Sequence, residues 1–173
     1  MKWLPIGLAV VAALVLIVVI VGTLLPRGHV ASRTLRVRRP PADVWALITG
    51  VDAFTSWRPD VKTVERLPDR NGRPIWKERV SGMDIPLETT ESDPPRRLVL
   101  RIADPKLPFG GTWTYVIAPT PDGSTLTITE DGFVSNPVFR LMSRLVFGHH
   151  ATIDAYLKNV AKRFDEEPAL SGE

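Results

Sequence analysis

Two glutamates, Glu78 and Glu130, are the residues of this sequence best placed for acid–base chemistry. Side chains two positions apart in a β-strand lie on the same face, so Glu78 shares a face with Trp76, and Glu130 shares one with apolar residues of its own strand. A carboxylate held among apolar side chains is harder to ionise and can act as a general base or as a polar anchor for a ligand. In the alternative interpretation both glutamates are structural, and they reach water at strand ends or pair with arginines such as Arg79 and Arg101.

The histidine pair His149-His150 does not support a metal site. Adjacent residues on a helix point about 100° apart, so the two imidazoles cannot readily bind one ion. The chain has no cysteine and no third ligand at a suitable spacing, and we therefore predict no metal and no cofactor. We expect His149 to line the inner face of the last helix, and neither histidine forms a convincing triad with Ser143 or Asp154.

Several aromatic residues could surround an apolar ligand or form a plain hydrophobic core. They are Trp45, Trp57, Trp76, Trp113 and Tyr115. In a small sheet domain the core interpretation is the commoner one. However, a sheet covered by a single helix leaves concave space that side chains or a ligand must fill, and this favours a ligand cage here.

Length, charge and composition exclude several classes of protein. The chain of 173 residues suffices for one ordinary domain, and its formal net charge of +3 is too small for a nucleic-acid-binding surface. The absence of cysteine excludes disulfides, thiolate zinc sites and a cysteine nucleophile, but it does not fix the compartment. Phe109-Gly110-Gly111 is too short for a phosphate-binding loop and precedes no predicted helix, so no nucleotide site is expected.

Residues 3–26 form the most distinctive segment, because they contain no charged side chain and consist mainly of Leu, Ala, Val and Ile. A helix of this length is about 36 Å long, against about 30 Å for the hydrocarbon core of a bilayer. Lys2 and Arg27 flank the run and Trp3 lies at its boundary, as is typical of a membrane span. A cleaved signal peptide is the alternative, but its apolar core would be shorter and a small-residue cleavage site would follow. We therefore predict an uncleaved, single-pass transmembrane helix.

Basic residues indicate on which side of the membrane the rest of the chain lies. Lys2 precedes the span, whereas a group of arginines follows it closely: Arg27, Arg33, Arg36, Arg38 and Arg39. The positive-inside rule then places the domain in the cytoplasm, attached to the cell membrane. Most of these arginines also belong to the first predicted strand.

Apolar periodicity predicts the order of elements after the apolar segment. A first strand is followed by two short helices, the first of which starts at Pro41. Six strands come next, with turn signals such as Asn71-Gly72 between them. They cover residues 61–67, 75–80, 85–91, 97–102, 112–118 and 124–130. Alternation within these strands predicts an antiparallel sheet with one covered face and one exposed, threonine-rich face.

One long amphipathic helix is predicted to close the domain. Asn136 and Pro137 are typical of a helix start, and apolar residues then recur at three-and-four spacing for about seven turns, as far as Phe164. Gly148 is a weak point in that helix, and residues 166–173 are predicted to form a disordered tail.

Short motifs occur in a fixed order along residues 30–165. They are Pro41-Ala42-Asp43-Val44-Trp45, Trp57-Arg58-Pro59, Gly111-Thr112-Trp113-Thr114-Tyr115, Thr129-Glu130, Asn136-Pro137, Phe147-Gly148 and Tyr156-Leu157. In this order the chain resembles the SRPBCC superfamily, also called START-like or helix-grip. Within it, the chain is most similar to the polyketide cyclase/dehydrase and lipid transport family.

The resemblance implies an α+β helix-grip fold preceded by the transmembrane helix. In this fold a curved antiparallel sheet of about seven strands wraps around the long C-terminal helix and leaves an apolar cavity between them. The side chains expected to line the cavity are Trp76, Glu78, Leu100, Trp113, Tyr115, Ile128, Glu130, Met142, His149 and Tyr156. The family shares no catalytic motif, so the resemblance assigns no catalytic residue.

The function expected from these features is a membrane-anchored binding or transfer module for a hydrophobic small molecule or lipid. Two alternatives stay open. One is an enzyme, similar to a polyketide cyclase or a hydrolase, that uses a cavity carboxylate. The other is a ligand-free protein-interaction or assembly factor. No nucleic-acid partner is predicted, and the sequence indicates neither the ligand nor the oligomeric state.

Overall fold

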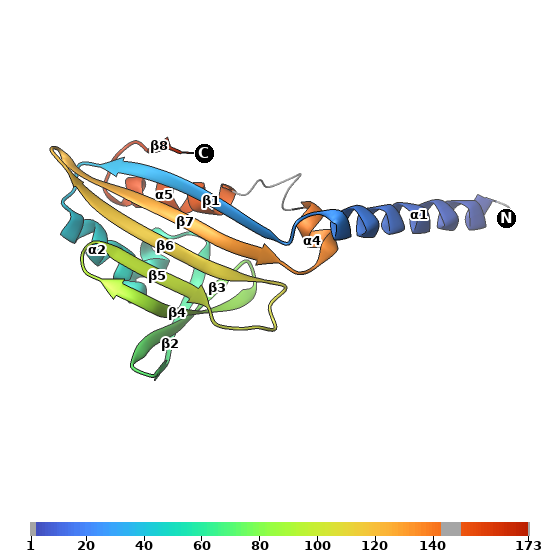
Figure 1. Ribbon diagram of the computed structural model, residues 1–173, viewed down its shortest axis with the longest axis horizontal. Helices are drawn as coiled ribbons and strands as arrows, with labels where there is room; N and C mark the ends of the chain where they lie inside the picture. The colour runs from blue at the N-terminus through green and yellow to red at the C-terminus, as the bar shows by residue number, and fades with distance from the viewer. Residues whose placement is uncertain (1–2, 143–149, 173) are drawn as a thin grey trace.

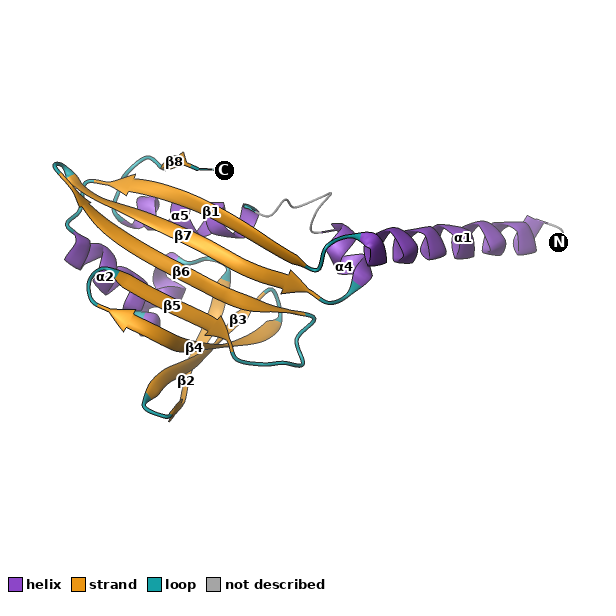
Figure 2. Cartoon of the chain, in the orientation of Figure 1, coloured by secondary structure: helices purple, strands orange, loops and turns teal. Residues whose placement is uncertain are grey.

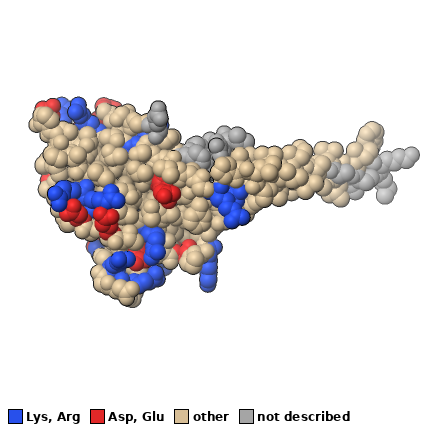
Figure 3. Space-filling view, in the orientation of Figure 1, with Lys and Arg blue, Asp and Glu red and all other residues tan. Residues whose placement is uncertain are grey.

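The chain consists of a projecting helix and one α+β domain. The computed structural model describes residues 3–142 and 150–172. Helix α1 (Trp3–Leu24) extends away from the domain as a rod (Figure 1). In the view of Figure 3 charged side chains gather on the domain, whereas the described part of α1 carries none. By length and composition, α1 could cross a membrane.

A curved sheet of eight antiparallel strands forms the body of the domain (Figure 2). Its strand order is β2-β3-β4-β5-β6-β7-β1-β8. The six strands predicted after the short helices are therefore confirmed as consecutive neighbours in one antiparallel sheet, and β1 pairs with the last of them. The strands are β1 (Gly28–Val37), β2 (Val61–Arg70), β3 (Arg73–Val80), β4 (Met83–Asp93), β5 (Arg97–Ile102), β6 (Phe109–Thr120), β7 (Gly123–Val134) and β8 (Ala169–Ser171).

Helices cover one face of this sheet, as Figure 1 shows. They are α2 (Pro41–Thr49), the 3₁₀ turn η1 (Val51–Ala53), α3 (Phe54–Trp57) and α5 (Ala151–Arg163). The buried residues of α5 recur at the predicted three-and-four spacing, from Ile153 to Val160. They join the apolar side chains of the sheet in a single core, in which Leu35 and Leu126 are fully buried. We call the helix-covered face of the sheet the inner face.

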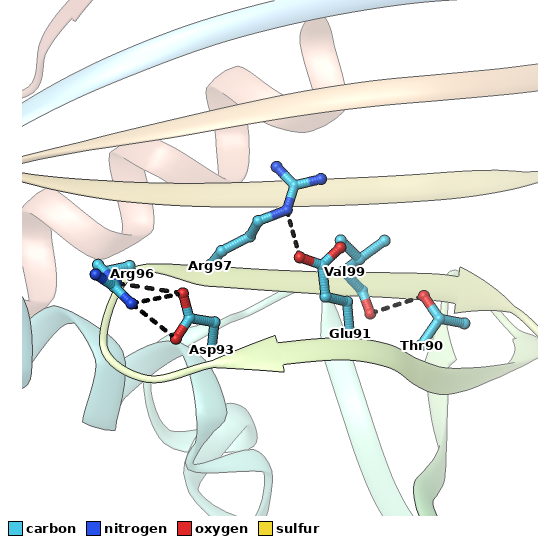
Figure 4. Close-up of polar contacts among 6 residues, drawn as sticks. All are labelled: Thr90, Glu91, Asp93, Arg96, Arg97 and Val99. Atoms are coloured by element: carbon cyan, nitrogen blue, oxygen red, sulfur yellow. Dashed lines mark hydrogen bonds and ion pairs between the residues drawn. The ribbon is translucent and has the colours of Figure 1, made fainter.

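The opposite, outer face carries solvated polar contacts, as the pairing of β4 with β5 illustrates (Figure 4). Its register shifts just before Glu91, which is the mark of a β-bulge. The bulged Thr90 donates its hydroxyl hydrogen to the carbonyl oxygen of Val99 (3.3 Å), and Arg97 donates to Glu91 (2.7 Å). Exposed ion pairs of this kind contribute at most about 1 kcal/mol. The buried aromatic side chains, in contrast, lie on the inner face.

The described helices near the C-terminus differ from the single long helix that the sequence predicts. The described residues form two helices with different partners: α4 (Pro137–Met142) packs against α1 and the end of β7, whereas α5 packs against β1 and α3. The predicted start is confirmed, because the side-chain oxygen of Asn136 accepts hydrogen bonds from the backbone N–H groups of Val138 (2.9 Å) and Phe139 (3.2 Å). Apolar spacing alone cannot reveal that two parts of one periodic run face different surfaces.

The segment predicted as a disordered tail contains a strand. β8 pairs with β1, and its Leu170 lies opposite Leu35 and packs against the core. The sheet therefore has eight strands rather than about seven, and part of the free edge of β1 is covered. A three-residue strand among polar residues is too short to leave a periodic signal in the sequence.

Replacing Leu157 with Ala tests whether α5 is the main cover of the sheet. Leu157 is fully buried, and removing its side chain should lower the free energy of unfolding by about 2–5 kcal/mol. The exposed neighbour Lys158 provides the control, since Lys158→Ala should change stability by no more than about 0.5 kcal/mol. Denaturant unfolding of the detergent-solubilised chain measures both, and equal effects would show that α5 does not pack as described.

Candidate functional site

A cluster of aromatic rings occupies the centre of the inner face, and Tyr156 of α5 lies in its middle. Its ring lies 5.5 Å from Trp57 of α3, 5.8 Å from Tyr115 and 5.9 Å from Trp113, the last two on β6. All three contacts are edge-to-face, the geometry that aromatic pairs favour. The side chains thus bring a helix, a short turn and the sheet together at one point.

A buried ion pair lies beside this cluster and joins Glu78 of β3 to Arg58, which directly follows α3. The two side chains approach to 2.9 Å, and their exposed fractions are 3% for Glu78 and 11% for Arg58. The guanidinium carbon of Arg58 also lies 5.1 Å from the ring centres of both Phe54 and Tyr156. Arg58 is therefore held between two aromatic faces, where cation–π attraction adds to the ion pair.

Glu78 is engaged through both of its carboxylate oxygens. One forms the ion pair with Arg58, and the other accepts a hydrogen bond from the indole N–H of Trp76 at 2.9 Å. A general base must reach the proton that it abstracts, and here both oxygens already have fixed donors. The geometry therefore suits Glu78 to positioning Arg58 rather than to proton transfer.

The hydroxyl groups of Tyr115 and Tyr156 are neutral donors or acceptors in this site. Burial raises the pKa of Tyr115 well above its usual value and also raises the pKa of Tyr156, and it outweighs the opposite effect of the nearby Arg58 charge. The two hydroxyls hydrogen-bond to each other. The two hydroxyls are therefore uncharged polar groups near neutral pH, and they lie within the aromatic cluster.

A second polar pair, Glu130 with His29, lies where β7 meets β1, and β7 is the fourth strand along the sheet from β3. The His29 Nε2 atom lies 3.4 Å from a carboxylate oxygen of Glu130, and both side chains are partly accessible. Burial raises the pKa of Glu130, although the charge and hydrogen bond of His29 and a hydrogen bond with Trp113 act in the opposite direction. A carboxylic acid of this kind can exchange a proton, which the Glu78 carboxylate is poorly arranged to do.

A glycine makes the second pair possible. Gly132 lies opposite His29 in the β1–β7 pairing, and a Cβ at this position would come within 2.9 Å of the imidazole. Any larger residue would therefore push His29 away from Glu130. Gly132 lies within a regular strand, and because it has no side chain, it leaves space for the imidazole of His29.

Open hollows on the described surface lie outside this cluster, although one of them reaches its edge at Trp57. One, of about 390 Å³, is bordered by α2, α3 and the end of α5, and its lining includes Leu47, Trp57 and Phe164. Another, of about 470 Å³, lies beside the β2–β3 turn and is lined by Leu67 and Pro86 among others. Glu78 and Glu130 line neither of them.

Most of the residues predicted to line a cavity lie together on the inner face. Trp76, Glu78, Leu100, Tyr115, Ile128 and Tyr156 are buried there, and Trp113 and Glu130 are partly buried beside them. Met142 is different: it lies on α4 and is 42% exposed, because α4 packs against α1 and the end of β7 instead of the inner face of the sheet. His149 lies outside the described residues. A ligand-binding role for any of these side chains remains a prediction.

Arg58 and His29 are not among the site residues predicted from the sequence. Glu78 pairs with Arg58 rather than with Arg79 or Arg101, which contact Asp84 and Glu88 instead. The available signal was the position of Arg58 directly after Trp57 in a motif that the family resemblance uses. For His29 the available signal was weaker, because it lies at the start of β1, close to the apolar segment.

A protein family matches the domain that these elements form. The family model described as polyketide cyclase / dehydrase and lipid transport matches residues 29–165. The chain belongs to this family. The match confirms the resemblance to the SRPBCC superfamily. No curated protein matches the chain.

Solved structures of low sequence identity share the fold. The aromatase/cyclase Zhui from Streptomyces sp. R1128 has 15% identity and a TM-score of 0.63, over 80% of this chain and 94% of its own. A START superfamily protein from Mycobacterium smegmatis has 20% identity and a TM-score of 0.61, over 79% and 97%. The di-domain aromatase/cyclase StfQ of the steffimycin biosynthetic pathway has 15% identity and a TM-score of 0.60, over 78% of this chain but only 49% of its own, so this chain spans about half of it.

Removing the Glu78 carboxylate should destabilise the protein strongly. Glu78→Ala leaves Arg58 buried without its main partner, and we expect a loss of about 3 kcal/mol, the lower end of the usual range because Asp60 still contacts Arg58. Asp84→Ala, which breaks the exposed pair with Arg79, should cost at most about 1 kcal/mol. Denaturant unfolding compares the two variants, and a similar small loss for both would contradict a structural role for the buried pair.

The pH dependence of stability should reveal the raised pKa of Glu130. The folded protein binds this proton more tightly than the unfolded chain, so the stabilisation is complete below a pH of about 4.5 and is lost as the pH rises through the raised pKa. Glu130→Gln removes this pH dependence. As the pH rises from about 4.5 towards neutrality, the wild type loses this stabilisation and the variant does not, so the free energy of unfolding of the variant should increase relative to that of the wild type.

An oppositely shifted glutamate provides the control for this measurement. A hydrogen bond from Arg101 lowers the pKa of Glu88, so its contribution is present above the ordinary glutamate pKa and is lost as the pH falls. Glu88→Gln should therefore lose stability relative to the wild type as the pH rises towards about 4.5, which is below the range in which Glu130 should show its effect. Parallel profiles for the Glu88 and Glu130 variants would show that the burial of Glu130 does not govern its titration.

Proposed function

We propose that this protein is a membrane-anchored module that binds a hydrophobic small molecule or lipid on the inner face of its sheet. The observation that carries the proposal is the aromatic cluster around Tyr156, flanked by polar pairs at Arg58–Glu78 and His29–Glu130. Ligand sites of this class consist mainly of apolar and aromatic surface with a few fixed polar groups. The fold and the family described above are consistent with this use.

A ligand would enter this site most easily near Trp113 and Glu130, because the side chains there are the more exposed ones. Trp113 is only partly buried, and the side chains of His29 and Glu130 are 15% and 21% exposed. The Arg58–Glu78 end is closed by comparison, since Glu78 is 3% exposed. A ligand would thus place its apolar body against Trp113 and its polar group near Glu130.

The anchoring part of the proposal rests on α1. The helix is almost entirely apolar, and its side chains are largely exposed, with α4 packed against its C-terminal end. A helix of 22 residues is about 33 Å long, enough to cross a hydrocarbon core of about 30 Å. A binding domain held at a bilayer has immediate access to apolar ligands dissolved there.

A cyclase-like enzyme is the competing proposal, and the Glu130–His29 pair is the observation that favours it. Glu130 with a raised pKa could move a proton during an aldol-type ring closure, in which one carbon loses a proton and a carbonyl oxygen gains one. Two similar structures are described as aromatase/cyclases, which makes this chemistry compatible with the fold.

Native mass spectrometry of the membrane-extracted full chain tests the binding proposal. We expect a retained apolar molecule in the wild type and a loss of about tenfold or more in occupancy for Trp113→Ala, because a large part of the apolar contact is removed. Trp45→Ala is the matched control, since Trp45 lies on α2 and is packed against the core without a ring contact to Tyr156. It should retain the ligand.

The same measurement separates a binder from an enzyme. Glu130→Gln keeps the size of the side chain and much of its hydrogen bonding, so a binder should retain the same molecule at an affinity within about tenfold. A cyclase that eliminates water would instead accumulate a heavier, unconverted molecule in the Glu130→Gln variant than in the wild type. Wild-type protein that carries no small molecule in any preparation would contradict both proposals and favour a protein-interaction role.

A further inference from the structure

One buried arginine joins the projecting helix to the domain. Arg140 of α4 donates from one terminal nitrogen to the carbonyl oxygens of Gly22 (2.9 Å) and Leu25 (3.0 Å), which lie at the end of α1 and just beyond it. Its other nitrogens donate to the carbonyl oxygens of Ser135 (2.9 Å) and Val134 (3.1 Å). The last carbonyls of a helix lack partners within the helix, and a cationic donor satisfies them well. The end of α1 is thereby fixed to the end of β7.

A glycine allows α1 and α4 to touch at this joint. Gly22 is buried, and a Cβ at its position would overlap the carbonyl oxygen of Pro137, the first residue of α4. Gly7, near the other end of α1, has nothing within 4 Å of such a Cβ. Close approach is therefore required at Gly22 specifically, and the two helices form one packed unit.

The exposed surface of α4 is entirely apolar. Val138, Phe139 and Met142 are 42%, 60% and 42% exposed, whereas Arg140, the one charged residue of this helix, is turned inward and is 5% exposed. A six-residue helix with this distribution has no polar side towards the solvent. An exposed apolar surface next to a helix that could span a bilayer is typical of a site that contacts a membrane or another protein.

The length of α1 sets the depth at which α4 lies. Gly22 is two residues from the end of the helix at Leu24, which corresponds to about 3 Å along its axis. Charged residues begin shortly after, with the exposed Arg27. If α1 crosses the hydrocarbon core, α4 lies at the boundary between acyl chains and headgroups, where amphipathic helices are buried by about 5–10 Å.

We propose that α4 is a membrane-interface contact: Val138, Phe139 and Met142 insert into the bilayer that α1 spans, and the Arg140–Gly22 joint holds the domain against that surface. The proposal rests on the anchoring part of the proposed function and adds to it a fixed orientation. The access end of the site, at Glu130 and His29, precedes α4 on β7 and follows α1 on β1, so it faces towards the bilayer.

Site-specific fluorescence of the full chain in liposomes tests this directly. The chain has no cysteine, so single substitutions can each carry one environment-sensitive nitrobenzoxadiazole label. Phe139→Cys reports on α4, Leu14→Cys reports on the middle of α1, and Val116→Cys, on an exposed part of β6, is the control. Liposomes of phosphatidylcholine and phosphatidylglycerol contain lipids with a nitroxide quencher either near the headgroup or near the acyl end.

We expect the Phe139 label to be quenched by the shallow nitroxide at least about twofold more than the Val116 label, and the Leu14 label to be quenched most by the deep one. A Phe139 label that behaves like the Val116 label, together with a deeply quenched Leu14 label, would overturn the interface contact and leave the anchor intact. A Leu14 label that escapes quenching would overturn the anchor and, with it, the contact.

The joint is tested by a second substitution in the Phe139→Cys background. Gly22→Val should separate α1 from α4 and reduce the shallow quenching of the Phe139 label, whereas Gly7→Val should leave it unchanged. Both variants keep the span equally apolar, so insertion of α1 is preserved. Unchanged quenching in the Gly22→Val variant would show that the joint does not hold α4 at the membrane.

Discussion

The domain depends on keeping one positive charge inside an aromatic interior. Arg58 follows α3, pairs with Glu78 on β3, and lies between the rings of Phe54 and Tyr156. A buried charge is tolerated only when its partners are well placed, so the positions of α3, β3 and α5 are mutually constrained. Moving any of them would expose the charge or leave it unpaired. The aromatic contacts of Tyr156 with Trp113 and Tyr115 then connect this point to the centre of the sheet.

Two glutamates with similar sequence settings have different physical roles as a result. Glu78 is deeply buried but fully partnered, since an arginine and an indole occupy its two oxygens. Glu130 is more accessible, and burial still raises its pKa, because the opposing effect of its histidine partner at 3.4 Å is smaller than the effect of burial. The two carboxylates thus differ in the number and charge of the groups that face them.

Local periodicity predicted the faces correctly and could not predict the partners. Alternation placed Glu78 and Glu130 on the inner face because the side-chain period of a strand depends only on neighbouring residues. The partner of Glu78 comes from a turn about twenty positions earlier, and no local pattern encodes that contact. The separation of α4 from α5 was missed for a related reason: Arg140 stabilises α4 by contacting the end of α1, which is distant in sequence. β8 was missed because three residues are too few for a period.

The path of the chain from α1 into the sheet determines how the domain bears mechanical load. α1 leads after a short connection into β1, which lies inside the sheet between β7 and β8. β1 pairs with β7 in continuous register from Gly28 to Val37, and the bond from the Val134 N–H to the Arg27 carbonyl oxygen extends the ladder towards α1. A pull on the helix therefore acts along β1 and loads many parallel hydrogen bonds at once in shear, instead of opening them one after another.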